Sequence, residues 1–224
     1  MRIRRFLFLG GIATLGGALA VLVSPVLGRA RQSLRTSSSP GAGPYELAAG
    51  LFLRGWYDDL AADCAAALTG VRSPAILEIG PGPGHLAERL LARLPDATWT
   101  GLDVDAGMLE AAGRRLTAAG HAGRGSLILA DVAGMPIVDA SVDLVVSSLS
   151  AHHWINAEAG FREIRRVLRP DGRALIVDLP AGLAHLEGGG RGPVAADLVF
   201  ASQARRRFRG IGPWTIAWQV ELIR

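Results

Sequence analysis

The sequence contains no lysine, and all 24 of its basic residues are arginine. This absence excludes a Walker-type P-loop lysine, a Schiff-base lysine and a Ser–Lys nucleophile pair. The only cysteine is Cys64, which excludes a disulfide framework and a cysteine-built zinc or iron–sulfur site. Hydrophobic residues nevertheless make up 50% of the 224 residues, so the chain has enough apolar surface to bury one sizeable core. General disorder is therefore excluded as well.

Acidic residues are missing from residues 1–35, which carry six arginines. The remaining 18 arginines stand against 20 acidic residues, so the rest of the chain has a net charge of −2. A mildly acidic domain lacks the basic surface on which phosphate binding usually depends, and no nucleic-acid partner is expected. The basic cluster Arg205–Arg209 is interpreted as a solvated or lipid-facing surface.

A long uncharged segment, Phe6–Gly28, lies between two groups of three arginines. As a helix it would measure about 34 Å, which is enough to cross a bilayer core of roughly 30 Å. We favour a single membrane anchor within residues 1–35. Two alternatives stay open: an export signal, with Ala18-Leu19-Ala20 as its cleavage site and Arg4-Arg5 as a twin-arginine start, and a start codon placed too early. The positive-inside rule does not orient the segment, because both flanks carry three arginines.

A Ser/Gly/Pro linker over residues 36–44 is expected to connect this segment to a folded domain at 45–224. In that domain, apolar runs without period-2 alternation indicate strands buried on both faces of a parallel sheet. Strands are predicted at 75–79, 98–103, 126–130, 142–147 and 174–178, and helices within 46–69, 85–94, 106–119 and 157–168. The turn residues 169–172 are expected to end the last helix. This alternation predicts a doubly wound, Rossmann-like α/β fold with a mostly parallel sheet.

The first predicted strand runs into a glycine-rich turn that contains Gly80, Gly82 and Gly84. Glycines let the backbone turn sharply and approach a ligand closely, and the helix that follows favours a negative group at its N-terminus. The turn is not the dinucleotide fingerprint, because His85 occupies the position of its third glycine. Glu78 lies inside the strand, where burial is costly without a partner, and a ligand cation or a backbone amide is expected to pair with it.

Two further acids stand at strand ends. Asp103 ends the second strand, and a carboxylate there can accept both hydroxyls of a ribose. The neighbouring Asp105 fits the role of helix N-cap better than Asp103 does. Asp131 follows the third strand, so three carboxylates are expected at adjacent strand ends beside the glycine-rich turn.

With these motifs the sequence resembles the class I S-adenosylmethionine-dependent methyltransferases of the small-molecule type, over about residues 45–180. Four segments match the family's motifs in order: Leu77–Gly84, Gly101–Asp105 with Met108-Leu109, Ala130–Val146, and Val167–Gly172. Pro83 replaces the family's commoner small or polar residue, and Asp171 replaces its commoner glycine. The family usually ends with two strands in a hairpin. Here only Trp214–Ile223 is visible, so the sheet edge is expected to be one strand short, with Trp214 and Trp218 packing there.

The resemblance implies S-adenosylmethionine as cofactor. It implies that the three glycines cradle the methionine part, with Glu78 nearby, and that Asp103 holds the ribose hydroxyls. Asp131 would accept from the adenine amino group. The remaining cofactor-binding residues implied by the motifs are Val104, Val132 and Ser148.

Methyl transfer from a sulfonium is an in-line displacement, so its catalysis is mostly proximity and alignment. A base is needed only where the acceptor must lose a proton, and His152 and His153 are the candidates, with a packing role equally open. Adjacent histidines without partners do not form a metal site, and no metal is expected. Trp56, Tyr57 and Asp58 are expected to close over the cofactor.

The sequence therefore predicts a methyltransferase that acts on a small acceptor, apolar or membrane-associated. A nicotinamide-dependent oxidoreductase, disfavoured by His85 and Asp131, and a non-catalytic cofactor-binding membrane module are the alternatives. Because S-adenosylmethionine is used in the cytoplasm, we expect the anchor to be retained and residues 45–224 to face the cytoplasm. A soluble cytoplasmic enzyme with a misassigned start is the alternative. Tethering raises the effective concentration of acceptors in the same membrane, which favours a lipid-like acceptor.

Overall fold

The computed structural model describes residues 53–179, 200, 202–208 and 217–224. The predicted anchor Phe6–Gly28, the linker 36–44, residues 46–52 of the first predicted helical region and Trp214 lie outside these ranges. The proposed division of the chain at residues 35 and 44 therefore stays a prediction.

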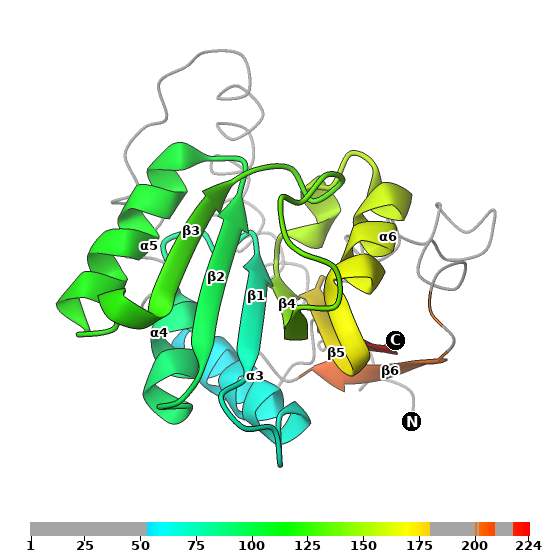
Figure 1. Ribbon diagram of the computed structural model, residues 1–224, viewed down its shortest axis with the longest axis horizontal. Coiled ribbons are helices and arrows are strands. Elements are labelled where there is room, and N and C mark those ends of the chain that lie inside the picture. Colours follow the sequence, from blue (N-terminus) through cyan, green and yellow to red (C-terminus); the bar gives the residue numbers. More distant parts are fainter. Residues whose placement is uncertain (1–52, 180–199, 201, 209–216) are drawn as a thin grey trace, which may run out of the picture. The chain divides into compact units, whose positions relative to one another are not determined.

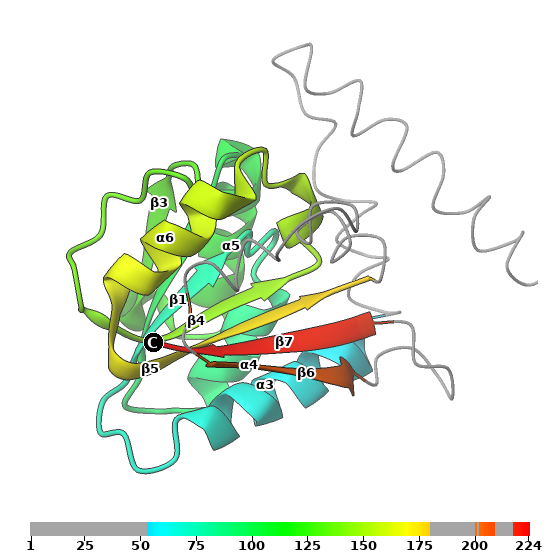
Figure 2. The same ribbon diagram turned by 90° about the vertical axis from the view of Figure 1, so that its right-hand side faces the viewer.

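Seven strands form one sheet in the order β3-β2-β1-β4-β5-β7-β6 (Figures 1 and 2). Their bounds are β1 Ala75–Ile79, β2 Thr98–Asp103, β3 Gly125–Leu129, β4 Val142–Ser148, β5 Leu168–Asp178, β6 Ser202–Phe208 and β7 Ala217–Ile223. β1 to β5 are mutually parallel, and β7 runs antiparallel to both β5 and β6. The strand order reverses between β1 and β4, and ligands in such sheets bind at the carboxyl ends of the strands at this switch point. The predicted mostly parallel α/β sheet is confirmed.

Helices cover both faces of this sheet. On one face lie α3 (Arg54–Ala67), α4 (His85–Arg93) and α5 (Ala106–Ala118), and on the other lies α6 (Ala157–Val167), as Figure 1 shows. Two short 3-10 helices, η1 (Ala122–Arg124) and η2 (Ala151–His153), follow α5 and β4. Alternate residues of the central strands enter two separate cores: Ile76 and Val146 pack with the first group of helices, whereas Leu77 and Val145 pack with α6. β1 and β4 are therefore buried on both faces, as predicted.

β3 departs from the predicted burial. It pairs with β2 alone and forms one edge of the sheet. Leu127 and Leu129 in this strand are 41% and 62% exposed. The apolar run is the same as in the central strands, but the edge position leaves part of it in contact with solvent.

The predicted turn at 169–172 does not separate the helix from the next strand. β5 begins at Leu168, directly after α6, and contains the turn residues. The register against β4 jumps from the pair Val142 and Leu168 to the pair Leu144 and Arg173, and Asp171 takes a φ of 65°. The extra residues therefore bulge out of the ladder instead of ending it.

The expectation that the sheet edge is one strand short is wrong, because β6 pairs antiparallel with β7 and completes the hairpin (Figure 2). The segment Ser202–Phe208 contains three consecutive arginines and only one large apolar residue, Phe208, which is buried. Sequence reasoning missed the strand because it relied on apolar runs. Trp218 lies in β7, in register with Asp178 of β5.

Candidate active site

The glycine-rich turn joins β1 to α4, and its three glycines all have positive φ. At Gly80 an added Cβ would lie 2.0 Å from Ser150 Oγ, so the turn touches the segment that follows β4. Gly84 is the N-cap of α4 and packs closely on α5. At Gly82, by contrast, a Cβ would meet nothing within 4 Å. The turn therefore leaves open space at Gly82, while Gly80 packs against Ser150 and Gly84 packs against α5 on either side of it.

Asp103 lies at the end of β2, close to this turn. The amide of Asp105 donates to its Oδ1 at 3.0 Å, and the amides of Gly82 and Val104 also favour its ionised form. Burial raises the pKa of Asp103, and the amide donors oppose that rise. Asp105 is the N-cap of α5, as predicted, because its side chain accepts from the amides of Gly107 and Met108. Asp103 is thus not needed as the helix cap.

Glu78 is 2% exposed, and its hydrogen-bond partner within the fold is a side chain of β2. The indole Nε1 of Trp99 donates to its Oε2 at 2.9 Å. Burial raises the pKa of Glu78 to about 8, although the indole hydrogen bond works in the opposite direction. Sequence reasoning expected a different partner because it did not consider cross-strand side chains of β2.

Asp131 and Val132 follow β3 at the adjacent strand end. Asp131 is exposed, and its Oδ1 accepts from the amide of Ala133 at 2.7 Å. Val132 is buried in the core on the α6 side, where Gly160 gives it room. The Asp131 side chain therefore lies at the surface, where it is hydrogen-bonded within its own turn. The buried Val132 side chain anchors the same turn to the core.

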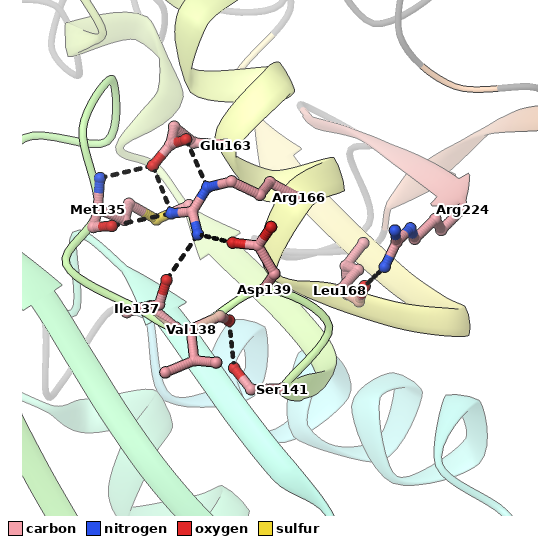
Figure 3. Close-up of polar contacts among 9 residues, drawn as sticks. All are labelled: Met135, Ile137, Val138, Asp139, Ser141, Glu163, Arg166, Leu168 and Arg224. Atoms are coloured by element: carbon pink, nitrogen blue, oxygen red, sulfur yellow. Dashed lines mark hydrogen bonds and ion pairs between the residues drawn. The ribbon is translucent and has the colours of Figure 1, made fainter.

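Arg166 of α6 fixes the continuation of this loop (Figure 3). Its guanidinium donates to the carbonyl oxygens of Met135 and Ile137 and to the carboxylates of Asp139 and Glu163, at 2.6–2.9 Å. Glu163 in turn accepts from the amide of Met135 at 2.8 Å, and its hydrogen bond from Arg166 lowers its pKa. One arginine thus holds residues 135–139 against α6, a function that no motif in the sequence indicated.

Ser148 ends β4 and accepts a hydrogen bond of 2.8 Å from Trp56 Nε1 of α3. Because the indole is the donor, the Ser148 hydroxyl can donate its own proton to another group. Trp56 is fully buried, and the ring of Tyr57 stacks on His85 at 5.6 Å between centroids. Asp58 accepts from Arg89 Nε at 2.7 Å. These three residues tie α3 to β4 and α4.

His152 and His153 lie in η2, just after β4, with their ring centroids 4.0 Å apart. His152 Nδ1 lies 3.0 Å from both carboxylate oxygens of Asp178, a fully buried residue that ends β5. His153 is more exposed, and burial is the main cause that lowers its pKa. Sequence reasoning missed Asp178, although its place as an acid at the end of a parallel strand matches that of Asp103.

Within the described ranges, no group of three or more His, Cys, Asp or Glu side chains is arranged to hold a metal ion. The same part of the chain contains no helix that is long and apolar enough to cross a membrane.

Comparison with known proteins relates part of this chain to methyltransferases. Residues 76–172 match the family model of a methyltransferase domain. The chain is 30% identical over 104 residues to the ubiquinone/menaquinone biosynthesis C-methyltransferase UbiE of Geotalea daltonii, covering 46% of this chain and 44% of that protein. It is 33% identical over 159 residues to the malonyl-[acyl-carrier protein] O-methyltransferase of Geobacter sulfurreducens, covering 63% of this chain and 58% of that protein. The chain therefore spans about half the length of these relatives.

Among solved structures, the fold resembles a protein of Methanococcus maripaludis that was proposed to be an S-adenosylmethionine-dependent methyltransferase. The TM-score is 0.66 at 20% identity, over 84% of this chain and 95% of that one. At this identity the likeness establishes the fold, and the family match runs from β1 to Gly172 near the start of β5. Residues 76–172 are therefore similar to a methyltransferase domain, within a fold that resembles S-adenosylmethionine-dependent methyltransferases.

Proposed function

We propose that this chain is an enzyme that transfers a methyl group from S-adenosylmethionine to a small acceptor. The observation that carries the proposal is the open space at Gly82, close to the carboxylate of Asp103 at the switch point of the sheet. The exposed backbone of the turn and the Asp103 carboxylate lie next to each other there. S-adenosylmethionine requires such a pair, because its ribose is joined to a charged amino-acid group.

The residues of this edge fit the parts of that cofactor. Asp103 supports the proposed ribose site because a carboxylate can accept from two hydroxyls. Val104, next to it, is 67% exposed and offers an apolar surface to a planar base. The Ser148 hydroxyl, with Trp56 as its donor, can donate to a carboxylate. The roles of Asp131 and Val132 toward the adenine are proposed on the same basis.

S-adenosylmethionine supplies an electrophilic methyl group when it is bound. The work of the chain's own residues is then to hold donor and acceptor in line and to exclude water, since such alignment accounts for much of the barrier reduction. The glycine-rich turn and Asp103 would hold the methyl donor. The segment after β4, which contacts Gly80 through Ser150, would position the acceptor.

Calorimetric titration of the full chain with S-adenosylmethionine, and separately with NADH, tests this proposal. We expect saturable binding of S-adenosylmethionine and none of NADH. Binding of NADH alone would support the oxidoreductase alternative, which His85 disfavours because it is buried where a third glycine would stand. Binding of S-adenosylmethionine without methyl transfer to any component of a membrane lipid extract would support the non-catalytic alternative.

We further propose that Phe6–Gly28 tethers the enzyme to a membrane, with residues 45–224 in the cytoplasm and an apolar or lipid-like acceptor. Its length and its lack of charge support this proposal. Cells that express a C-terminally tagged chain can be fractionated and their spheroplasts treated with protease. A full-length, membrane-bound and protected tag is expected. A shortened periplasmic product or a wholly soluble one would contradict the tether, and neither result would bear on methyl transfer.

A further inference from the structure

Asp178 holds His152 at two points. The backbone N–H of His152 donates to Oδ2 at 3.1 Å, and the ring Nδ1 lies 3.0 Å from both oxygens. Leu179 N donates to Oδ1 at 2.8 Å and holds the carboxylate from the other side. Asp178 is fully buried, whereas the His152 side chain is 27% exposed. Of the two side chains, only the imidazole is therefore accessible to a substrate.

This contact fixes which ring nitrogen of His152 carries the proton. A carboxylate accepts hydrogen bonds and does not donate them, so the neutral imidazole must be protonated at Nδ1. Its lone pair is then on Nε2, on the other side of the ring, where a proton can be taken up. The resulting imidazolium would be stabilised by Asp178, as in the acid–histidine pair of a serine protease.

The pair also lies beside the proposed cofactor turn. Ser150 packs directly on Gly80, and the carbonyl of Ser150 accepts from His153 N at 2.9 Å. The amide of Leu149 donates to Val177 O at 2.9 Å, which joins the same segment to β5 just before Asp178. The glycine-rich turn, η2 and the end of β5 are therefore one contiguous set of contacts.

Apolar side chains flank the pair. Ile155, which follows η2, is 94% exposed, and Leu179, next to Asp178, is 40% exposed. The titratable groups that interact with His152, within the described ranges, are Asp178 and the tilted ring of His153. A base in these surroundings suits an acceptor with an apolar body and one polar, proton-bearing atom.

We propose that Asp178 is a positioning residue that orients His152 as the general base of methyl transfer, and that the acceptor carries a dissociable proton on the atom that becomes methylated. This inference rests on the proposed methyltransferase function. In the step, His152 Nε2 takes the proton from the acceptor atom, and that atom bonds to the methyl carbon. The carbon–sulfur bond breaks, and its electron pair stays on sulfur as a neutral thioether. The imidazolium later returns the proton to solvent.

The test combines a measurement on the protein itself with kinetics. Nitrogen-15 NMR of histidine-labelled full-length chain reports which nitrogen of His152 carries the proton at a pH where the ring is neutral. The variants are Asp178→Asn and His152→Gln, with Asp96→Asn and His121→Gln as matched changes outside the site. Rates are measured as label transfer from radiolabelled S-adenosylmethionine to a membrane lipid extract, and cofactor binding is measured by calorimetry.

We expect protonation at Nδ1 in the unmodified chain and a different tautomer ratio in Asp178→Asn. We expect His152→Gln to lower the transfer rate by about 10²–10⁴-fold, the usual contribution of a general base. The dependence of the transfer rate on pH should change in His152→Gln and persist in His121→Gln. Binding of S-adenosylmethionine should change by less than about twofold, because a base that acts on the acceptor contributes little to cofactor binding.

Protonation of the neutral His152 ring at Nε2 in the unmodified chain would overturn the proposal without any acceptor being known. An unchanged rate and pH profile in His152→Gln would overturn it too. If the unmodified chain does not bind S-adenosylmethionine, the proposed function is wrong. That result can be distinguished from a failure of the His152 proposal alone.

Discussion

The indole of Trp99 and the carboxylate of Glu78 form a hydrogen bond of 2.9 Å between neighbouring strands at the centre of the fold. Gly101 provides the space for this contact, because a Cβ there would lie 2.2 Å from Trp99 Cη2. Gly101 is also the residue of β2 in register with Glu78. Gly101, which belongs to a predicted cofactor motif, is therefore also needed for packing, because it makes room for the indole that hydrogen-bonds the buried Glu78.

Replacing Gly101 with alanine should displace the Trp99 indole and weaken its bond to Glu78. Overpacking a close-packed core typically costs about 1–3 kcal/mol, and we expect that loss in the free energy of unfolding measured with urea. Gly123→Ala is the control, since a Cβ at Gly123 meets nothing within 4 Å. Equal losses in the two variants would contradict this role of Gly101.

Glu78 should make the stability of the cofactor-free chain depend on pH. Its pKa is raised from 4.5 to about 8 in the folded state, so between these values the folded chain holds a proton that the unfolded chain has released. The free energy of unfolding should therefore fall as pH rises through this window, by up to roughly 1.4 kcal/mol per pH unit. Glu78→Gln keeps an acceptor for the indole and should flatten this part of the curve. A Glu78→Gln curve parallel to that of the unmodified chain would show that the acid is ionised in the fold.

A side chain at Gly82 should block the cofactor. Gly82 and Gly120 both have positive φ and open space around a built Cβ, but Gly120 lies at the end of α5, away from the site. Alanine at either position should cost about 1–2 kcal/mol of stability from the left-handed backbone. Only Gly82→Ala should also reduce the affinity for S-adenosylmethionine in calorimetry. Similar affinities in the two variants would make the turn purely structural.

Asp103→Ala should weaken binding of S-adenosylmethionine by about 1–3 kcal/mol, the usual cost of losing hydrogen bonds to a charged group. The fold should persist, because Asp103 lies at a strand end and Asp105 caps α5 without it. Far-UV circular dichroism checks the fold, and Asp96→Ala, which removes an exposed carboxylate at the opposite end of β2, is the binding control. Undiminished affinity in folded Asp103→Ala would remove this residue from the proposed site.

Arg166→Lys should loosen the loop that follows Asp131 and Val132. Lysine keeps the charge but cannot reach two carbonyl groups and two carboxylates with one planar group. We expect a loss of about 1–3 kcal/mol in stability, since buried and partly buried acceptors lose their donor, and weaker binding of S-adenosylmethionine. Arg162→Lys, on the exposed side of the same helix with Glu158 as its partner, should change neither by more than about 0.5 kcal/mol.

Apolar runs and turn residues were sufficient to predict β1, β2 and β4 within one residue, because central parallel strands are buried on both faces. They could not predict β6, whose sequence is arginine-rich and whose place depends on pairing with β7. Nor could they predict that Leu168 starts a strand, because this depends on a distant partner, Val142. Apolar patterns along the sequence indicate which residues are buried. The positions of edge strands and bulges depend instead on which other strand pairs with them.

The same limit applies to the site. The glycines were assigned to the candidate site from their short Gly-x-Gly-x-Gly spacing, and Asp103 from its place at the end of a predicted strand. Asp178 and Arg166 act through contacts with residues 26 to 31 positions away, and a single sequence carries no direct sign of such contacts. The partner of Glu78 was missed for a similar reason, since it lies 21 positions along the chain in another strand.

The contact between Gly80 and Ser150 constrains how such an enzyme can change its acceptor. A larger side chain at residue 150 would collide with the glycine-rich turn, and a side chain at residue 80 would displace the segment that carries His152 and His153. Neither position can vary alone without disturbing the donor side of the reaction. Diversification toward new acceptors must therefore start farther out, at exposed residues such as Ile155 and Leu179, whose side chains can be exchanged while the donor turn keeps its shape.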